Sequence, residues 1–311
     1  MSMNGIFSYE KIVIKEGCGK DKPNEFSECR IVLQHHQPAE EASSTALSRI
    51  GYELDREITL SVGHGTTHVA CTIDLCLLTM YEGEKCRLKT KCDAASSAEE
   101  FFALDVTLLS FVAAAELYST SCNDKLMRAV TLKELGTSAF IAGDITAAFH
   151  KFSRSLKYLA CADVDNKQPT SSAVHDNVSQ TGTDDGNPVL LTNGNVSDGN
   201  TCSLTRKDIA QLTCHCWLNL AACQLRYQNF RMAAVNCSKA LSIDQNNVKG
   251  LFRRAQCYMK TGNEHAAVID LEQALALESG SREIKKLLST ARQLTRKYDD
   301  NLAAAMSKMF R

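Results

Sequence analysis

The sequence has almost no net charge and no long apolar run. Lys and Arg number 35 against 36 Asp and Glu, and the two signs are interspersed, which gives no reason to expect binding to nucleic acid or to a membrane surface. Nowhere do about 18 apolar residues follow one another. The first residues, Met1 to Lys15, lack an apolar core between a basic end and a small-residue cleavage site. We therefore expect a soluble protein that is not secreted.

The sequence also lacks the cysteine spacing of disulfide frameworks and metal sites. Its 14 cysteines are scattered through apolar positions, which predicts reduced thiols in the core. Examples are Cys71, Cys76, Cys223, Cys237 and Cys257. Cys214-His215-Cys216 resembles part of a zinc site, but no second pair at zinc-like spacing accompanies it, so zinc is the less favoured interpretation.

No set of nucleophile, base and orienting partner of the Ser/His/Asp or Cys/His kind can be found in the sequence. We therefore expect no catalytic residue, metal or cofactor.

The first third of the chain alternates apolar and polar residues, which is typical of half-buried antiparallel strands. The alternating segments contain Tyr9, Ile12 and Ile14; Cys29, Ile31 and Leu33; Ile58, Leu60 and Val62; Cys86 and Leu88; and Phe102, Leu104, Val106 and Leu108. Between them, Ile73, Leu77 and Met80 have helical spacing and predict one short helix that ends at the turn with Gly83. The expected fold is α+β, an antiparallel sheet of about five strands with one helix packed across it.

Several segments in this order resemble the FKBP immunophilins, which are macrolide-binding peptidyl-prolyl isomerases. The likeness rests on Lys11 to Gly17, Leu60 to Gly63, Leu104 to Leu109 and, most specifically, Met80-Tyr81-Glu82-Gly83-Glu84-Lys85. It covers the first third of the chain, and we assign residues 1–117 to an FKBP-like domain.

The resemblance also implies a degenerate isomerase pocket. An FKBP active site is an apolar cup with an aromatic floor, which holds a proline ring and favours the twisted amide. Ala70 stands where the family usually has Ile in the cup, and Ile73 stands where it has the Trp of the floor. The loop before the last strand is also short. We expect a domain without isomerase activity, and the alternative is a residual pocket, because folds outlast the sites on them.

The second half of the chain repeats itself with an offset of 34 residues. Asn219-Leu220-Ala221 falls on Arg253-Arg254-Ala255, and Ala233, Ala240 and Leu241 fall on Ala267, Ala274 and Leu275. This is the tetratricopeptide (TPR) period, in which helical hairpins stack into a solenoid with a concave groove. We assign an all-α domain to residues 124–311, with repeats at 129–162, 214–247 and 248–281. Gly136 and Ala148 take the close-contact positions of the first repeat.

Two further segments flank these repeats. Residues 163–205 are rich in Asn, Ser, Thr, Gly and Asp, which predicts a disordered insert; a passive insertion is favoured over a regulatory, phosphorylated loop. Residues 282–311 carry an apolar stripe of Ile284, Leu287, Leu288, Ala291, Leu294 and Tyr298. We expect a helix that caps the solenoid, with a calmodulin target as the alternative.

Five residues stand at positions that resemble the carboxylate clamp of some TPR proteins. These residues are Lys133 and Thr137 in the first repeat, Asn219 in the second, and Lys249 and Arg253 in the third. In that family the set grips the C-terminal carboxylate and the last Asp of a chaperone ending in Glu-Glu-Val-Asp. Three cations facing one groove suit two carboxylates, and only Thr137 departs from the usual residue, Asn.

Together the two halves resemble a large FKBP-type immunophilin whose isomerase site has degenerated. The resemblance implies a co-chaperone that binds the tail of heat-shock protein 90 (Hsp90), or that of the seventy-kilodalton chaperone, and presents clients such as steroid receptors or cell-cycle regulators. It implies a cytoplasmic protein, with the nucleus as a second compartment. The alternatives are an active prolyl isomerase targeted to chaperone complexes, and a scaffold whose groove is occupied by an internal segment.

Overall fold

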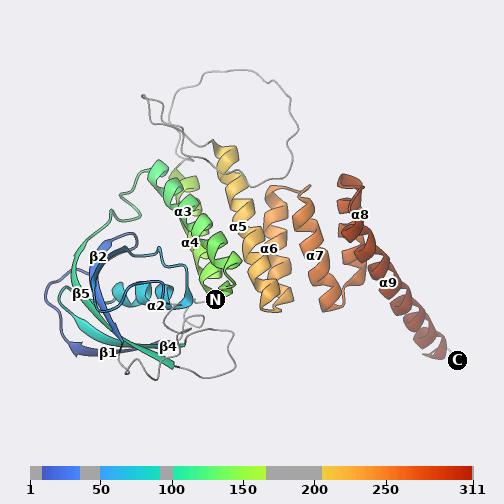
Figure 1. Ribbon diagram of the computed structural model, residues 1–311. Coiled ribbons are helices and arrows are strands. Elements are labelled where there is room, and N and C mark those ends of the chain that lie inside the picture. The colour runs from blue at the N-terminus through green and yellow to red at the C-terminus, as the bar shows by residue number, and fades with distance from the viewer. Residues whose placement is uncertain (1–8, 36–49, 92–100, 166–204, 310–311) are drawn as a thin grey trace, which may run out of the picture.

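The computed structural model describes residues 9–35, 50–91, 101–165 and 205–309. These residues form a β-rich half followed by a row of helices (Figure 1). The predicted order, an α+β domain and then an all-helical domain, is confirmed. The proposed insert lies almost entirely outside the described residues.

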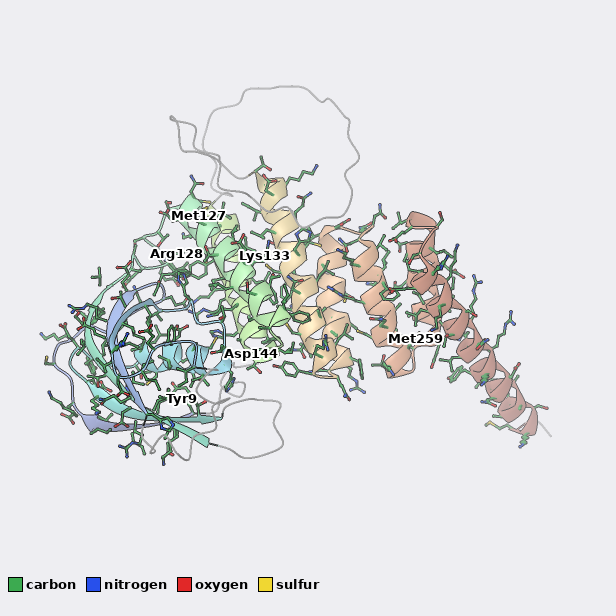
Figure 2. All side chains as sticks on the ribbon, in the orientation of Figure 1. Tyr9, Met127, Arg128, Lys133, Asp144 and Met259 are labelled. Carbon is green, nitrogen blue, oxygen red and sulfur yellow. The ribbon has the colours of Figure 1, made fainter. Side chains whose placement is uncertain are left out.

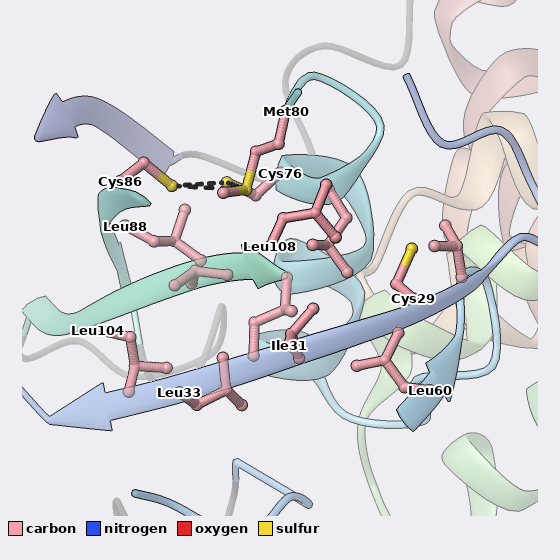
Figure 3. Packing of buried hydrophobic residues seen from close by; sticks show 14 of the residues in the cluster. Cys29, Ile31, Leu33, Leu60, Cys76, Met80, Cys86, Leu88, Leu104 and Leu108 are labelled. Atoms are coloured by element: carbon pink, nitrogen blue, oxygen red, sulfur yellow. Dashed lines mark hydrogen bonds between the residues drawn. The ribbon is translucent and has the colours of Figure 1, made fainter. Parts of the chain in front are cut away.

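In the described residues, five strands form one antiparallel sheet in the order β1-β4-β5-β2-β3. The strands are β1 (Tyr9–Lys15), β2 (Glu28–His35), β3 (Glu57–Ser61), β4 (Lys85–Lys91) and β5 (Phe101–Val112). The sheet curves around a single helix, α2 (His68–Leu77) (Figure 1). Buried side chains of the strands, among them Ile31, Leu33 and Leu104, form one core with Val69, Ile73 and Leu77 of this helix (Figure 3).

Strand β1 is partly buried through the face that carries Tyr9 and Lys11, so the prediction is confirmed for Tyr9 and wrong for Ile12 and Ile14. Ile12 and Ile14 are 40% and 47% exposed, whereas the side chain of Lys11 is only 17% exposed and its Nζ lies 2.7 Å from Glu84 Oε1. Lys11 Nζ also donates to Thr79 Oγ1 at 2.9 Å. The long methylene stem of lysine can cover apolar surface while its ammonium reaches these partners. The apolar residues of an edge strand are therefore a poor guide to its buried face.

Helix α2 begins earlier and ends earlier than its apolar spacing predicted. Thr67 caps it by accepting a hydrogen bond from Ala70 N at 3.1 Å, and Met80 lies in the turn beyond its last residue, Leu77. Every residue of α2 except Leu75 is buried. A helix enclosed on all sides has no polar face, which is why the sequence did not reveal its first turn.

The helical half is a succession of hairpins. The helices are α3 (Cys122–Ile141), α4 (Ile145–Asp165), α5 (Arg206–Arg226), α6 (Phe230–Ile243), α7 (Val248–Thr261), α8 (Glu264–Leu277) and α9 (Arg282–Met309). Gly136 and Ala148 hold close-contact positions as predicted. Ala148 is fully buried, and a Cβ atom added at Gly136 would lie 2.8 Å from Phe152 Cε1.

Helix α9 caps the row through its first half only. Ile284, Leu288 and Ala291 are buried in the cluster formed by α7, α8 and α9, but Leu294 and Tyr298 are 37% and 55% exposed. The buried part of the predicted stripe therefore ends at Ala291. Farther along α9, Tyr298 and Asp299 still contact His265 of α8 at the surface, and the end of α9 extends away from the other helices (Figure 1).

The cysteines expected in the core are buried and free. Among the helices of the described residues, none combines the length and the apolar character needed to cross a bilayer.

Candidate functional site

The predicted clamp residues lie on the first helix of each hairpin. Lys133 and Thr137 are on α3, Asn219 is on α5, and Lys249 and Arg253 are on α7. Figure 2 shows Lys133 in the part of α3 that lies beside α5. All five residues are exposed or half-buried, so each has some surface available to a ligand.

Thr137 and Arg253 already bond to the protein. Thr137 Oγ1 donates to the carbonyl oxygen of Lys133 at 2.9 Å, so its hydroxyl has only lone pairs left to offer to a ligand. Arg253 Nη1 donates to the carbonyl oxygen of Leu218 at 2.8 Å. Since Leu218 precedes Asn219, this bond brings the guanidinium of α7 to the part of α5 that carries Asn219.

The guanidinium of Arg253 is partly removed from water in this position. Burial lowers the pKa of Arg253, and the thiols of Cys237 and Cys223 oppose this decrease. Arginine stays charged even so. A cation partly withdrawn from water binds a carboxylate more strongly than one in bulk solvent, because the local dielectric constant is lower.

His215 lies near the predicted clamp residues, and sequence reasoning considered it only for zinc. It is on α5 one helical turn before Asn219, partly accessible to solvent and partly covered by its neighbours. Burial lowers the pKa of His215, Lys133 and Lys249 lower it further, and Asp244 opposes them. The two lysines, from α3 and α7, therefore both lie near the same stretch of α5. The spacing of four residues to Asn219 was the signal that could have identified His215.

No metal centre of the usual kind is found in the part of the chain that the structure describes, where no three His, Cys, Asp or Glu side chains gather as ligands would. Cys214 Sγ donates to the carbonyl oxygen of Ala240 at 3.6 Å, and Cys216 Sγ lies 3.3 Å from Ser155 Oγ.

The two positions compared with the isomerase pocket, Ala70 and Ile73, are 2% and 0% exposed. Ile73 belongs to the core between helix and sheet. Cys71 belongs to a different cluster, which it forms with Ala148, Phe152 and other residues of the helical half. Helix α2 is thus covered by its own sheet on one side and by the first hairpin on the other.

A buried lysine joins the two halves at this point. Lys151 of α4 donates from Nζ to the carbonyl oxygen of Gly63 at 2.7 Å and lies 3.6 Å from Asp74 Oδ2 of α2. Burial raises the pKa of Asp74, while Lys151 and the amides of Gly63 and Gly65 oppose the rise. A second link is the amide of His68, which donates to the Asp144 carboxylate. Asp144 lies at the end of the hairpin next to α2 (Figure 2).

Aromatic and ionic contacts extend this junction. The rings of Phe26 and Tyr158 meet edge to face with centroids 5.6 Å apart, and Tyr158 donates from its hydroxyl to Glu25 Oε2 at 2.8 Å. Arg154 of α4 forms an ion pair with the same glutamate. The β-rich half is therefore fixed to the first hairpin by polar and apolar contacts alike.

Comparison with known proteins defines the class of the first domain. Residues 7–111 match the sequence family described as "BDBT FKBP like N-terminal". The first domain is thus FKBP-like, and it is followed by a row of helical hairpins. The chain has homologues among the peptidyl-prolyl cis-trans isomerases named FKBP4.

Two of these relatives show how far the similarity extends. FKBP4 of Bos taurus is 25% identical over 310 residues, which are 94% of this chain and 56% of the relative. FKBP4 of Rattus norvegicus is 39% identical over 80 residues, which are 26% of this chain and 18% of the relative. The chain spans at most about half the length of the curated relatives it matches.

Three solved structures are also similar. The crystal structure of residues 1–211 of CG17282 matches with 19% identity and a TM-score of 0.49, over 72% of this chain and 91% of that one. A multi-domain immunophilin of Arabidopsis thaliana matches with 16% identity and a TM-score of 0.38, over 86% and 93%. The first TPR of Spaghetti (RPAP3), bound to the Hsp90 peptide SRMEEVD, matches with 18% identity and a TM-score of 0.37, over 55% and 95%.

Proposed function

We propose that this protein is a co-chaperone adaptor whose helical half binds an acidic C-terminal tail of the Glu-Glu-Val-Asp type, as carried by Hsp90. Two observations carry the proposal. Lys133 of α3 and Lys249 of α7, the helices before and after α5 in the row of first helices, both lower the pKa of His215 on α5. Arg253 of α7 bonds to α5 just before Asn219.

The carboxylates of such a tail match the positive charges of Lys133, Lys249 and Arg253. A chain ending in Asp presents two carboxylates close together, and charge-assisted hydrogen bonds contribute about 1.5–3 kcal/mol each. A few such bonds offset the ordering of a short peptide and leave affinity at about the micromolar level. Hsp90 is the favoured partner, and the seventy-kilodalton chaperone is the second.

The FKBP-like domain acts in this proposal by binding and not by turnover. With Ile73 in the core and Ala70 buried, the positions of the family's aromatic floor and cup wall supply neither an aromatic surface nor exposed area. Clients such as steroid receptors or cell-cycle regulators are held by this domain, and the complex works in the cytoplasm and nucleus.

Calorimetric titration of the full chain with the peptide Met-Glu-Glu-Val-Asp tests the tail-binding proposal. We expect binding near neutral pH that Lys249→Glu weakens by about 100-fold or more, because a like charge replaces one of the cations. Lys260→Glu is the matched control, since it makes the same charge change at the exposed end of the same helix and should bind as the wild type does.

Two further results decide the matter. A peptide whose C-terminal carboxylate is amidated should bind at least about tenfold more weakly, because one charged acceptor is removed. Equal affinity of the wild type and Lys249→Glu, or no heat of binding for the wild type, would contradict the proposal. Arg253→Ala is less suitable, because loss of its bond to Leu218 would change stability as well as binding.

A further inference from the structure

Three sulfur atoms lie together in the core of the FKBP-like domain. Cys76 Sγ is 3.5 Å from Cys86 Sγ and 3.9 Å from Met80 Sδ, and Cys86 Sγ is 3.7 Å from Met80 Sδ. All three residues are fully buried, and Figure 3 shows their side chains converging between α2 and β4. The sulfurs form a nearly equilateral triangle.

Separate segments bring these atoms together. Cys76 is in the last turn of α2, Met80 is in the following turn, and Cys86 is in β4 opposite Val13 of β1. The turn is fixed by the hydrogen bond from Met80 N to the carbonyl oxygen of Leu77, at 3.1 Å. The triangle is therefore held by the fold and not by one flexible loop.

The geometry points to a Cu(I) site formed by Cys76, Met80 and Cys86. Soft thiolate and thioether ligands select Cu(I) among the biological metals. The centre of a triangle with these sides lies about 2.1 Å from each sulfur, so an expansion of about 0.2 Å gives the usual metal–thiolate distance of about 2.3 Å. Zn²⁺ fits less well, because it favours four ligands in a tetrahedron.

The protons and charges of the proposed complex balance. Cu(I) with two thiolates and one thioether carries a net charge of −1, and binding releases the two thiol protons to solvent.

Anaerobic titration of the reduced full chain with Cu(I), in competition with the chelator bathocuproine disulfonate, tests the inference. We expect one equivalent of Cu(I) to stay with the wild type, and X-ray absorption to show three sulfur ligands at about 2.3 Å. Cys76→Ser combined with Cys86→Ser should lose this equivalent. Met80→Leu, which conserves volume, should weaken Cu(I) binding by about tenfold or more.

The control is Cys29→Ser, because Cys29 is equally buried in the same core but outside the triangle. It should retain the Cu(I) equivalent, whereas retention by the double serine variant would overturn the assignment. Release of all copper from the wild type to the chelator would do the same. If circular dichroism shows that the double variant is unfolded, Met80→Leu decides, since unchanged affinity in that variant would also refute the site.

Discussion

The Nζ atom of Lys151 lies 3.6 Å from Oδ2 of Asp74, and the two side chains are 1% and 4% exposed. Lysine is in α4 and aspartate in α2, so this ion pair links the FKBP-like domain to the helical domain. The carboxylate also accepts a hydrogen bond from Gly65 N at 3.1 Å. Buried charges are tolerated when they are paired and hydrogen-bonded in this manner.

Removal of one partner should therefore be costly. Lys151→Met keeps the apolar stem and leaves the Asp74 carboxyl buried without its cation, which we expect to lower the free energy of unfolding by about 3–5 kcal/mol. Chemical denaturation measures this change. Lys157→Met, 57% exposed and 3.8 Å from Glu25, should cost less than about 1 kcal/mol. Similar values for the two variants would mean that the pair does not hold the domains together.

Gly136 should not accept even a methyl group. A Cβ atom there would approach Phe152 Cε1 to 2.8 Å and Lys151 Cβ to 3.2 Å, so Gly136→Ala forces α3 and α4 apart and should cost about 1–3 kcal/mol. At Gly280 nothing lies within 4 Å of an added Cβ, and Gly280→Ala should be near neutral. Thermal unfolding of both variants compares them, and a stable Gly136→Ala would contradict the close approach of the helices.

His150 should make stability depend on pH below neutrality. Burial, assisted by the nearby charge of Lys151, lowers the pKa of His150 to about 4. The folded protein keeps this imidazole neutral, whereas the unfolded chain binds a proton below about pH 6.5, so stability falls as the pH decreases from 6.5 toward 4. The loss attributable to His150 should reach about 2 kcal/mol at pH 5.

Denaturation at pH 5 and pH 7.5 measures this dependence. His150→Gln should flatten it, because the titrating group is gone. The exposed His265, paired with Asp299 at 3.3 Å, provides the control variant His265→Gln, which should retain the wild-type slope. An unchanged slope in His150→Gln would show that other groups cause the pH dependence.

The full chain should not accelerate isomerisation of a prolyl tetrapeptide beyond its uncatalysed rate, which corresponds to tens to hundreds of seconds. Ile73→Trp should fail to restore turnover, because Ile73 is fully buried in the core. The larger side chain would overpack the core and lower the free energy of unfolding by about 1–3 kcal/mol. Acceleration by the wild type, measured in a protease-coupled assay, would refute the proposed loss of activity.

The fold was largely predictable because both halves have strong periodic patterns. Alternation located β2, and the repeat of small residues located the hairpins. In strand β1 the prediction was right for Tyr9 and wrong for Ile12 and Ile14, because Lys11, and not Ile12, is the residue with buried partners. Single-sequence patterns assume that apolar residues point inward, and an edge strand with a well-paired lysine violates that assumption.

The candidate groove was predictable in position and not in detail. The repeat period put Lys133, Asn219 and Lys249 on successive hairpins. The bond from Arg253 to Leu218 and the donor role of Thr137 toward Lys133 depend on rotamers that a sequence does not specify. The Lys151–Asp74 pair could not be predicted for another reason. It joins residues far apart in the chain, and no local sequence pattern identifies a lysine that will be buried.

The junction at α4 also has a mechanical consequence. With Lys151, Asp144 and Tyr158 all engaged by the β-rich half, no free tether separates the two domains, and the sheet cannot swing relative to the first hairpin. A client bound by the sheet and a chaperone tail bound by the helices would therefore be held at a fixed distance from each other. A flexible linker between the domains would instead let that distance vary.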